Sequence, residues 1–388
     1  MNTEKLVTLQ SRQDVSTYIE QAAANKTPLC VYRTSAPSGG QRLDLSELNK
    51  LIEIDADNLV ATAEPGLTMG ELAAALTEKG LRFLPADTPY YRHLTIGEWV
   101  YHGCPNPSSW KYRLGKHALM GSTYILPSGK LIKTGGKTVK NVTGYDFTRF
   151  LAGAYSDIGI GVEFLLKLLP QPEYRLQFLV GFPSLQHIFG FIDDLRQNPL
   201  APAFLMAADA KAGNLLLGLD DKIPFFLELE LDGVQQEVEA FAKKVRLWAK
   251  KSHAVSLAEN NPQETPFPLK FGNIFASQTA YTVCDEWKIP YDKQCTTLHE
   301  LKTKYNEIGW FGQWAEGKVH AAFTGEQSEA AAKIAKITNH VINSGGVSSG
   351  VYDRQQGRIP AGPLRPLEIA LRQRIDPQGI FTPKEVLV

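Results

Sequence analysis

The chain has 388 residues, more than the roughly 250–300 at which a single hydrophobic core stops growing, so its length predicts two or more domains. Its 41 Lys and Arg residues are balanced by 41 Asp and Glu residues, which leaves no electrostatic basis for binding nucleic acid. No apolar run approaches the ~20 residues of a membrane-spanning helix. The first residues also lack the apolar segment of a signal peptide, so we expect a cytoplasmic protein.

The cysteine pattern argues against a metal centre in this chain. The four cysteines form no Cys-x-x-Cys pair, which is the spacing that zinc ribbons and iron–sulfur clusters use; they are Cys30, Cys104, Cys284 and Cys295. We therefore predict reduced thiols and no bound metal.

Short strands, helices and glycine turns are expected over the first 170 residues. Residues 51–55 and 59–64 are predicted strands joined by a turn. Thr68 and Glu71 have the spacing of a capping box, which predicts a helix ending at Gly80. Residues 120–132 are predicted to form a strand pair that turns at residues 127–129.

A change of pattern follows Pro170-Gln-Pro172, where we place a domain boundary. A pattern of several strands and helices occurs twice over residues 173–353. It predicts an α+β domain, an antiparallel sheet with its helices on one side. Strands are expected near residues 175–182, 204, 215, 225–231, 281–283, 310 and 319–323. Apolar spacing predicts helices after Ser184, over 234–248, near 298–305 and around 334–341. Residues 354–388 form a third segment with one helix.

The densest candidate for chemistry is GGKTVKNVTGYDFTR, residues 135–149. Its glycines allow close approach of the backbone to a ligand. Lys137 and Lys140 supply positive charge, and Asp146 is placed to cap a helix over 147–152. A cation near the pyrimidine edge of a flavin would stabilise the negative charge of the reduced ring. A basic, solvated loop that closes a sheet is the alternative, and composition by itself favours it.

This segment resembles the PCMH-type FAD domain of the vanillyl-alcohol-oxidase superfamily, most closely the GlcE-like family of glycolate oxidase FAD-binding subunits, whose pattern contains KNVAGYD. Three further stretches are similar to that family: LDLSELNKLIEID at 43–55, EPGLTMGEL at 64–72 and DPQGIFTP at 376–383. The resemblance implies an FAD-binding domain of two α/β subdomains over residues 1–172. It also implies a cap or substrate domain over 173–353 and a return of 354–388 to the FAD domain.

The resemblance implies non-covalent FAD, held by a glycine-rich loop, a Thr-Ile-Gly turn, the lysine segment and the start of a strand. The expected cofactor-binding residues, carried over from the family pattern, are Ser38, Gly39, Gly40, Thr95, Ile96, Gly97, Lys137, Lys140, Asn141, Gly144, Tyr145, Gly159 and Ile160. The loop has no histidine for a covalent flavin link. No catalytic residue is assigned.

Two departures from the family pattern affect the phosphate contacts. The first loop is short, its glycines come late, and Pro37 offers no N–H. Glu98 stands where the family has a glycine. An ionised carboxylate about 4 Å from a phosphate adds up to ~4 kcal/mol of repulsion at an effective dielectric near 20. A scaffold protein that no longer binds FAD is therefore the alternative to a working flavoprotein, and a free-standing oxidase is a third hypothesis.

The family resemblance implies oxidation of a small 2-hydroxy acid such as glycolate, together with a second flavin subunit and an iron–sulfur subunit. Two cap residues are weaker candidates for contact with substrate. His320 is a possible base or carboxylate anchor on a strand, and Arg354 could pair with a carboxylate, since a planar guanidinium suits that group. An ordinary strand histidine and a surface arginine are the simpler interpretations.

Overall fold

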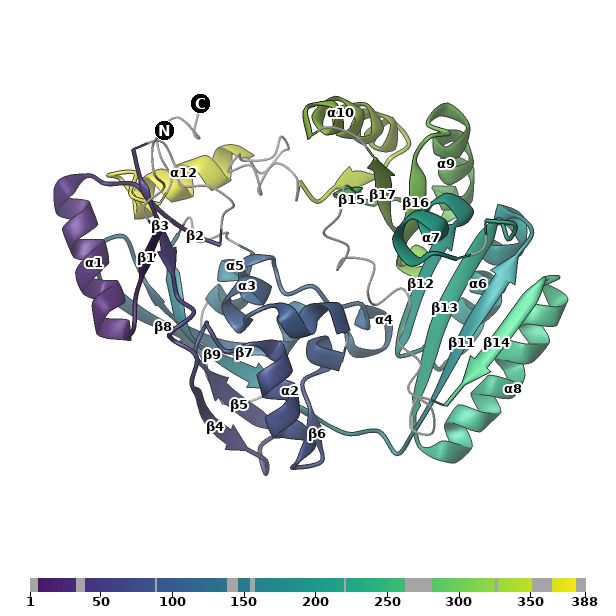
Figure 1. The fold of residues 1–388 in the computed structure, drawn as a ribbon, viewed down its shortest axis with the longest axis horizontal. Helices are drawn as coiled ribbons and strands as arrows, with labels where there is room; N and C mark the ends of the chain where they lie inside the picture. Colours follow the sequence, from purple (N-terminus) through teal and green to yellow (C-terminus); the bar gives the residue numbers. More distant parts are fainter. Residues whose placement is uncertain are drawn as a thin grey trace.

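The computed structural model describes residues 6–32, 39–87, 89–137, 146–153, 158–219, 221–261, 281–324, 327–350 and 365–381. Within these ranges the strands form four sheets, of which the two largest have five and eight strands. Figure 1 shows these two sheets on opposite sides of the molecule, each with its own helices.

The five-stranded sheet is antiparallel and follows the order β4-β5-β9-β7-β8. Its strands are β4 (Leu51–Asp55), β5 (Val60–Ala63), β9 (Ile160–Lys167), β7 (Leu119–Ile125) and β8 (Leu131–Gly135). The two expected strand pairs are confirmed as β4–β5 and β7–β8. Gly129, in the turn between β7 and β8, has φ +74°, a left-handed conformation that favours glycine.

A small parallel sheet packs on one end of this sheet. It joins β1 (Leu6–Thr8), β3 (Gln41–Asp44) and β2 (Leu29–Val31), with α1 (Arg12–Asn25) as the crossover between β1 and β2. Ile160 and Val162 of β9 share a buried apolar cluster with Val15 and Ile19 of α1. This cluster fixes the small sheet against β7 and β9.

The other end of the same face is covered by short helices. Alternate residues of β9 are buried, so Phe164 and Leu166 face the same way as Ile160 and Val162 but belong to a second apolar cluster. That cluster includes residues of α2 (Met69–Thr77), α3 (Ile96–Tyr101) and α5 (Phe147–Leu151). The predicted capping box of Thr68 and Glu71 opens α2, and Asp146 caps α5, as expected.

The eight-stranded sheet is antiparallel at each of its pairings, and the predicted fold class is confirmed. Its order is β14-β11-β13-β12-β16-β17-β15-β18. The strands are β14 (Ser256–Asn260), β11 (Tyr174–Phe182), β13 (Phe225–Gly233), β12 (Phe204–Asp209), β16 (Gly309–Gly312), β17 (Lys318–Thr324), β15 (Tyr281–Lys288) and β18 (Val347–Ser348). Four helices contribute to its main core: α6 (Leu185–Gln197), α8 (Gln235–Lys251), α9 (Tyr291–Lys304) and α10 (Gln327–Asn343).

One expected strand is wrong. Residues around Leu215 form α7 (Ala210–Leu217), which Asp209 caps by accepting the Ala212 N–H at 2.9 Å. Phe226 packs with α7, whereas its neighbours Leu227 and Phe225 belong to the main core. Because successive strand residues point to opposite faces, α7 covers the second face of the sheet. The helices therefore do not all lie on one side.

The C-terminal segment lies against the small parallel sheet. Figure 1 shows α12 (Arg365–Ile375), in yellow, beside the purple strands. The Leu29 N–H donates to the Ile380 carbonyl at 2.7 Å. The Asp376 carboxylate accepts the N–H groups of Ile380 and Phe381 at 2.9 and 2.7 Å, which turns these two side chains into the core beside α1.

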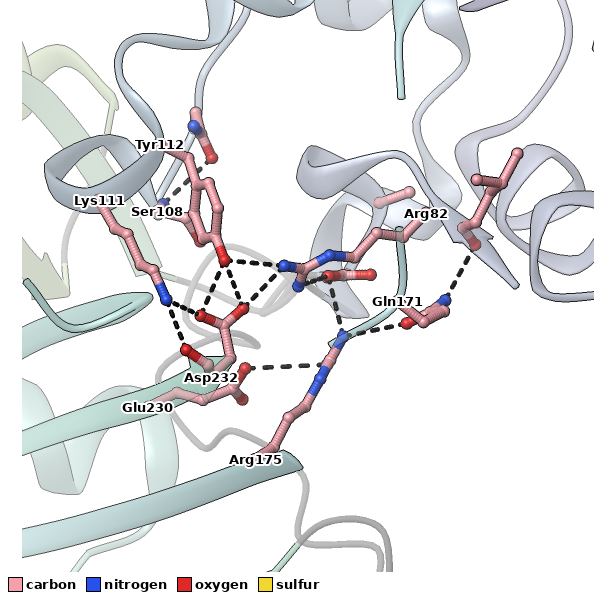
Figure 2. A network of polar contacts seen from close by, with 12 residues as sticks. Arg82, Ser108, Lys111, Tyr112, Gln171, Arg175, Glu230 and Asp232 are labelled. Atoms are coloured by element: carbon pink, nitrogen blue, oxygen red, sulfur yellow. Dashed lines mark hydrogen bonds and ion pairs between the residues drawn. The ribbon is translucent and has the colours of Figure 1, made fainter. Parts of the chain in front are cut away.

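Buried polar contacts join the eight-stranded sheet to the N-terminal elements (Figure 2). Asp232 of β13 has no exposed side-chain surface; it accepts from Arg82 of β6 (Leu81–Arg82) and from the Tyr112 hydroxyl, each at 2.8 Å. Lys111 also pairs with Asp232. Lys111 and Tyr112 come from the four-residue helix α4 (Ser109–Tyr112).

The same helix makes a second buried contact. The Ser109 hydroxyl donates to Glu316 at 2.7 Å, and Lys318 of β17 approaches the Ser109 oxygen at 2.9 Å. Glu316 ends the short 3-10 helix η5 (Trp314–Glu316). Helix α4 therefore touches both β13 and the η5–β17 segment of the large sheet.

Short elements complete the chain. They are β10 (Leu169–Pro170), which pairs with β6, and the 3-10 helices η1 (Leu84–Asp87), η2 (Pro89–His93) and η3 (Gly115–Ala118). Of the helices in the ranges given above, none combines the length and the apolar character needed to cross a bilayer.

Candidate cofactor site

A cavity of about 390 Å³ lies between the small parallel sheet and the start of α3. It falls within the range of roughly 300–1,000 Å³ that small-molecule and cofactor sites occupy. Arg42, Tyr32 and Ser46 bring donors to its wall, and Asp44 and Glu98 bring carboxylates. The lining residues are Leu6, Tyr32, Arg42, Leu43, Asp44, Leu45, Ser46, Gly66, Thr95 and Glu98.

The turn from Thr95 to Gly97 reaches this cavity through Thr95. Thr95 and Glu98 form a capping box: the Glu98 carboxylate accepts the Thr95 N–H at 2.8 Å, and the Thr95 hydroxyl oxygen accepts the Glu98 N–H at 3.1 Å. Glu98 is half-buried and is held at the start of α3. The Glu98 carboxylate thus accepts the Thr95 N–H, in a turn that the family resemblance assigns to phosphate binding.

The other two N–H groups of the turn are also used inside the chain. The Ile96 N–H donates to the Leu67 carbonyl and the Gly97 N–H to the Pro65 carbonyl, each at 2.8 Å. Ile96 is fully buried in the core. A ligand in the cavity therefore meets side chains of this turn rather than its backbone donors.

Gly97 is a glycine because Tyr32 lies directly on it. A Cβ at position 97 would come within 2.7 Å of the Tyr32 Cζ atom and 2.9 Å of the Pro65 side chain. Tyr32 also packs edge-on against Tyr101, with ring centroids 5.5 Å apart. The close approach expected between Gly97 and a cofactor is made here by Tyr32.

The glycine loop lies just before β3. Gly39 has φ +66° and open space around the position of a Cβ. Gly40 precedes Gln41, the first residue of β3, and Arg42 to Asp44 of that strand line the cavity. Ser38, the third residue predicted for this loop, lies outside the described residues.

Lys137 makes a specific ion pair away from the cavity lining. Its Nζ lies 2.7 Å from a Glu53 carboxylate oxygen and 3.6 Å from Asp55, both on β4. These acids raise the pKa of Lys137, chiefly through the hydrogen bond to Glu53. The pair links the chain after β8 to the opposite edge strand of the same sheet. Lys140, Asn141, Gly144 and Tyr145 lie outside the described residues.

Gly159 and Ile160 form the start of β9. A Cβ at Gly159 would lie 2.9 Å from the Ile125 carbonyl oxygen, so the glycine allows β9 to approach β7 closely. Ile160 is buried in the cluster that holds the small parallel sheet. Tyr32 packs against the same cluster as Ile160. Neither Gly159 nor Ile160 is among the cavity-lining residues.

His320 is not among the cavity-lining residues. His320 of β17 stacks on Phe311, with ring centroids 5.1 Å apart, and its Nε2 lies 3.5 Å from Glu286. The ring is thus engaged within the large sheet. Arg354 lies outside the described residues. Among the residues that the structure describes, no group of His, Cys, Asp and Glu is arranged to hold a metal.

Several cavity residues were missed from the sequence. Tyr32 precedes the glycine loop and carries no motif signal. Asp44 and Leu45 belong to the LDLS stretch, and Gly66 to the EPGLT stretch, so these two motifs could have pointed to the site. Gly66 is required because a Cβ there would lie 2.6 Å from the Ser46 carbonyl oxygen. Two of the recognised motifs therefore reach the cavity, but the sequence did not single out the side chains that line it.

The cavity fits part of a dinucleotide. The Tyr32 hydroxyl is buried against Gly97 and, in the part of the chain that the structure describes, has no hydrogen-bond partner, so it is a donor left over at the cavity wall. Arg42 adds a guanidinium to the same wall. The cavity volume and these donors suit a phosphate- and ribose-containing group.

Comparison with known proteins identifies the group. Residues 3–135 match the FAD binding domain family, and this interval includes every residue that lines the cavity. The expected cofactor, FAD, is thereby confirmed. The family match ends at Gly135, the first residue of the lysine segment.

Two curated relatives belong to glycolate oxidase. The chain is 26% identical to the GlcD subunit of Bacillus subtilis over 90% of its own length and 80% of that protein. It is 31% identical to the GlcE subunit of Escherichia coli over 47% of its own length and 53% of that protein. Both subunits are relatives, so the likeness is not specific to GlcE.

Solved structures share the fold. The structure of p-cresol methylhydroxylase with substrate bound superposes with a TM-score of 0.74 over 99% of this chain and 88% of that one, at 18% identity. The two chains therefore share their overall fold.

Proposed function

We propose that this chain is an FAD-linked oxidoreductase that oxidises a small 2-hydroxy acid such as glycolate, with FAD bound non-covalently. The observation that carries the proposal is the coincidence of the cavity lining with the matched FAD-binding interval, residues 3–135. Glycolate oxidase subunits among the relatives support the substrate class.

Oxidation of a 2-hydroxy acid removes two electrons and two hydrogens, one from the carbinol carbon and one from its hydroxyl, and leaves a 2-oxo acid. FAD supplies the two-electron acceptor for this chemistry. The protein binds and orients the cofactor: Tyr32, Arg42 and Ser46 face the cavity from the small parallel sheet and the loop after it. The remaining expected contacts, from Lys140 to Tyr145, are part of the same proposal.

We further propose that the chain works as one component of a complex, beside a second flavin subunit and an iron–sulfur subunit. Two relatives are named as subunits, which supports this arrangement. The cysteine spacing of the chain contains no cluster motif, so a partner would carry the next electron acceptor.

The test is an absorption spectrum of the purified chain, followed by titration of stripped protein with FAD. We expect a yellow protein, a rise in melting temperature with FAD concentration, and bleaching of the flavin by glycolate without oxygen. FMN, which lacks the adenylate half, is the control and should bind more weakly. A colourless chain with a melting temperature unchanged by FAD would instead identify a scaffold protein.

A further inference from the structure

Tyr32 holds an unusual position at the end of β2. Its φ is +59°, in the left-handed region that residues other than glycine seldom adopt. It immediately precedes the predicted phosphate loop and lines the cavity. A bulky residue held in this conformation points to a function for its side chain rather than to a preference of the backbone.

Within the described part of the chain, the surroundings of the Tyr32 hydroxyl provide its O–H group with no well-placed acceptor. Over the described ranges this hydroxyl is buried and makes no hydrogen bond of normal geometry, and Thr95 and Glu98 lie on the same cavity wall. The hydrogen bonds of Thr95 and Glu98 are made to each other in the capping box. Burial, and then the charge of Glu98, raise the pKa of Tyr32 well above its usual value, and the nearby Thr95 side chain offsets this only in part. The hydroxyl therefore keeps its proton.

The ring cannot move toward α3. It lies against Gly97, where even a Cβ would be too close, and its edge contacts Tyr101. The O–H bond can rotate about the ring carbon, so the donor can turn toward a ligand without any movement of the ring. Meanwhile the N–H groups of Thr95, Ile96 and Gly97 are all occupied within the chain.

We propose that the Tyr32 hydroxyl donates a hydrogen bond to an oxygen of the ribose–diphosphate chain of FAD, in place of the backbone donors of the Thr95–Gly97 turn. This inference rests on the proposed function, because it requires that the chain bind FAD. It assigns a cofactor-binding role to a residue that no sequence motif identified. It also explains why position 97 is glycine although its own N–H is occupied.

The experiment compares FAD dissociation constants of stripped wild-type protein and Tyr32→Phe, measured by calorimetry and by flavin fluorescence. Loss of a hydrogen bond to a charged acceptor predicts binding about 10- to 100-fold weaker. The melting temperature of the FAD-free variant should be equal to or higher than that of the wild type, since an unpaired buried hydroxyl is removed. Tyr291→Phe is the matched control, because that hydroxyl bonds Asp193 in the other half of the chain; its FAD affinity should stay unchanged.

A second variant, Tyr32→Gly, tests whether Tyr32 donates a hydrogen bond to FAD or merely occupies space that FAD would fill. Glycine accepts the positive φ and removes the ring, so the variant should fold. A donor role predicts weaker FAD binding, whereas tighter binding would show that Tyr32 merely fills the space of the cofactor and would overturn the inference. Equal affinities of wild type and Tyr32→Phe would overturn it too while leaving the proposed function intact. A wild-type chain that binds no FAD would overturn both.

Discussion

At the scale of single residues, Glu98 departs from the family pattern, which has a glycine at this position. Its carboxylate closes the capping box of α3 and also lines the cavity. One side chain thus stabilises a helix and places a carboxylate at the cavity that we propose as the binding site of an anionic cofactor. The two effects oppose each other, and a neutral amide of the same shape can separate them.

Replacing Glu98 with Gln should tighten FAD binding. The amide oxygen can still accept the Thr95 N–H, so the helix keeps its cap, while the repulsion, up to ~4 kcal/mol for charges about 4 Å apart at an effective dielectric near 20, is removed. We expect the gain in affinity to be at least about tenfold at low salt and smaller at high salt. Isothermal titration at two salt concentrations measures it.

The matched control is Glu71→Gln, which alters the other capping box, on α2, in the same way. Glu71 is not among the cavity-lining residues. The Glu71→Gln variant should change helix stability as Glu98→Gln does and leave the FAD dissociation constant unaltered. An equal effect of both variants on FAD would show that helix capping, and not charge, controls the site.

At the scale of elements, β13 shows how one strand serves two purposes. Leu227, Leu229 and Leu231 face the main core, and Glu230 and Asp232 alternate with them on the other face. Burial tends to raise the pKa of Asp232, but Arg82 and Lys111 hold it below its usual value. Burial raises the pKa of Glu230, and Arg175 and Gln177 offset this only in part. The two acids therefore affect stability in opposite directions.

Asp232→Asn should lower the free energy of unfolding at pH 7 by about 3 kcal/mol, the lower end of the ~3–5 kcal/mol for removing one partner of a buried ion pair. Asp87 still pairs with Arg82 at 3.0 Å, which limits the loss. A depressed pKa gives stability that is present above the unfolded value near 3.9 and lost as the pH falls through the folded value. The difference between variant and wild type should therefore shrink below about pH 4. Urea denaturation over this pH range tests it.

Glu230→Gln should have the opposite sign. A raised pKa means that ionisation at neutral pH costs stability, which is recovered as the pH falls below the unfolded value of about 4.3. The variant should unfold at higher urea than the wild type at pH 7 and at the same urea near pH 3. A loss of stability at pH 7 would show that the ion pair with Arg175, at 3.8 Å, outweighs the burial of the charge.

At the scale of the whole molecule, helix α4 couples the two large sheets. Figure 2 shows Lys111 and Tyr112 converging on Asp232 together with Arg82. On the same helix, Ser109 contacts Glu316 and Lys318. Because these contacts are buried and charge-assisted, they fix the orientation of the large sheet relative to the cofactor-binding part. The division into domains at residue 172 remains a proposal that this coupling makes testable.

The double variant Asp232→Asn with Glu316→Gln should uncouple the unfolding of the eight-stranded sheet from that of the N-terminal, cofactor-binding part. We expect one calorimetric transition for the wild type and two for the double variant, because the parts have separate apolar cores. Each single variant keeps one contact and should retain a single transition. Two transitions in the wild type would show that α4 does not couple the parts.

Much of the fold followed from local patterns. Hairpin turns, capping boxes and apolar spacing placed β4, β5, β7, β8, α2 and α8, because the physics behind them acts within a few residues. The strand expected near Leu215 failed because Asp209 caps a helix there and Phe226 offers that helix an apolar surface from a distant strand. Such a contact has no signature within residues 210–217.

The sequence by itself predicted the fold class, because the periodicity of strands and helices is set at short range, and its resemblance to a flavin-domain family implied the FAD cofactor. Only the tertiary structure decided which groups face the cavity. It showed Glu98 turned onto the Thr95 N–H, Lys137 paired across the sheet with Glu53, and a Tyr32 hydroxyl that no other described residue bonds. These outcomes depend on which distant segments meet, since a donor is available to a ligand only when no neighbour in the folded chain has taken it.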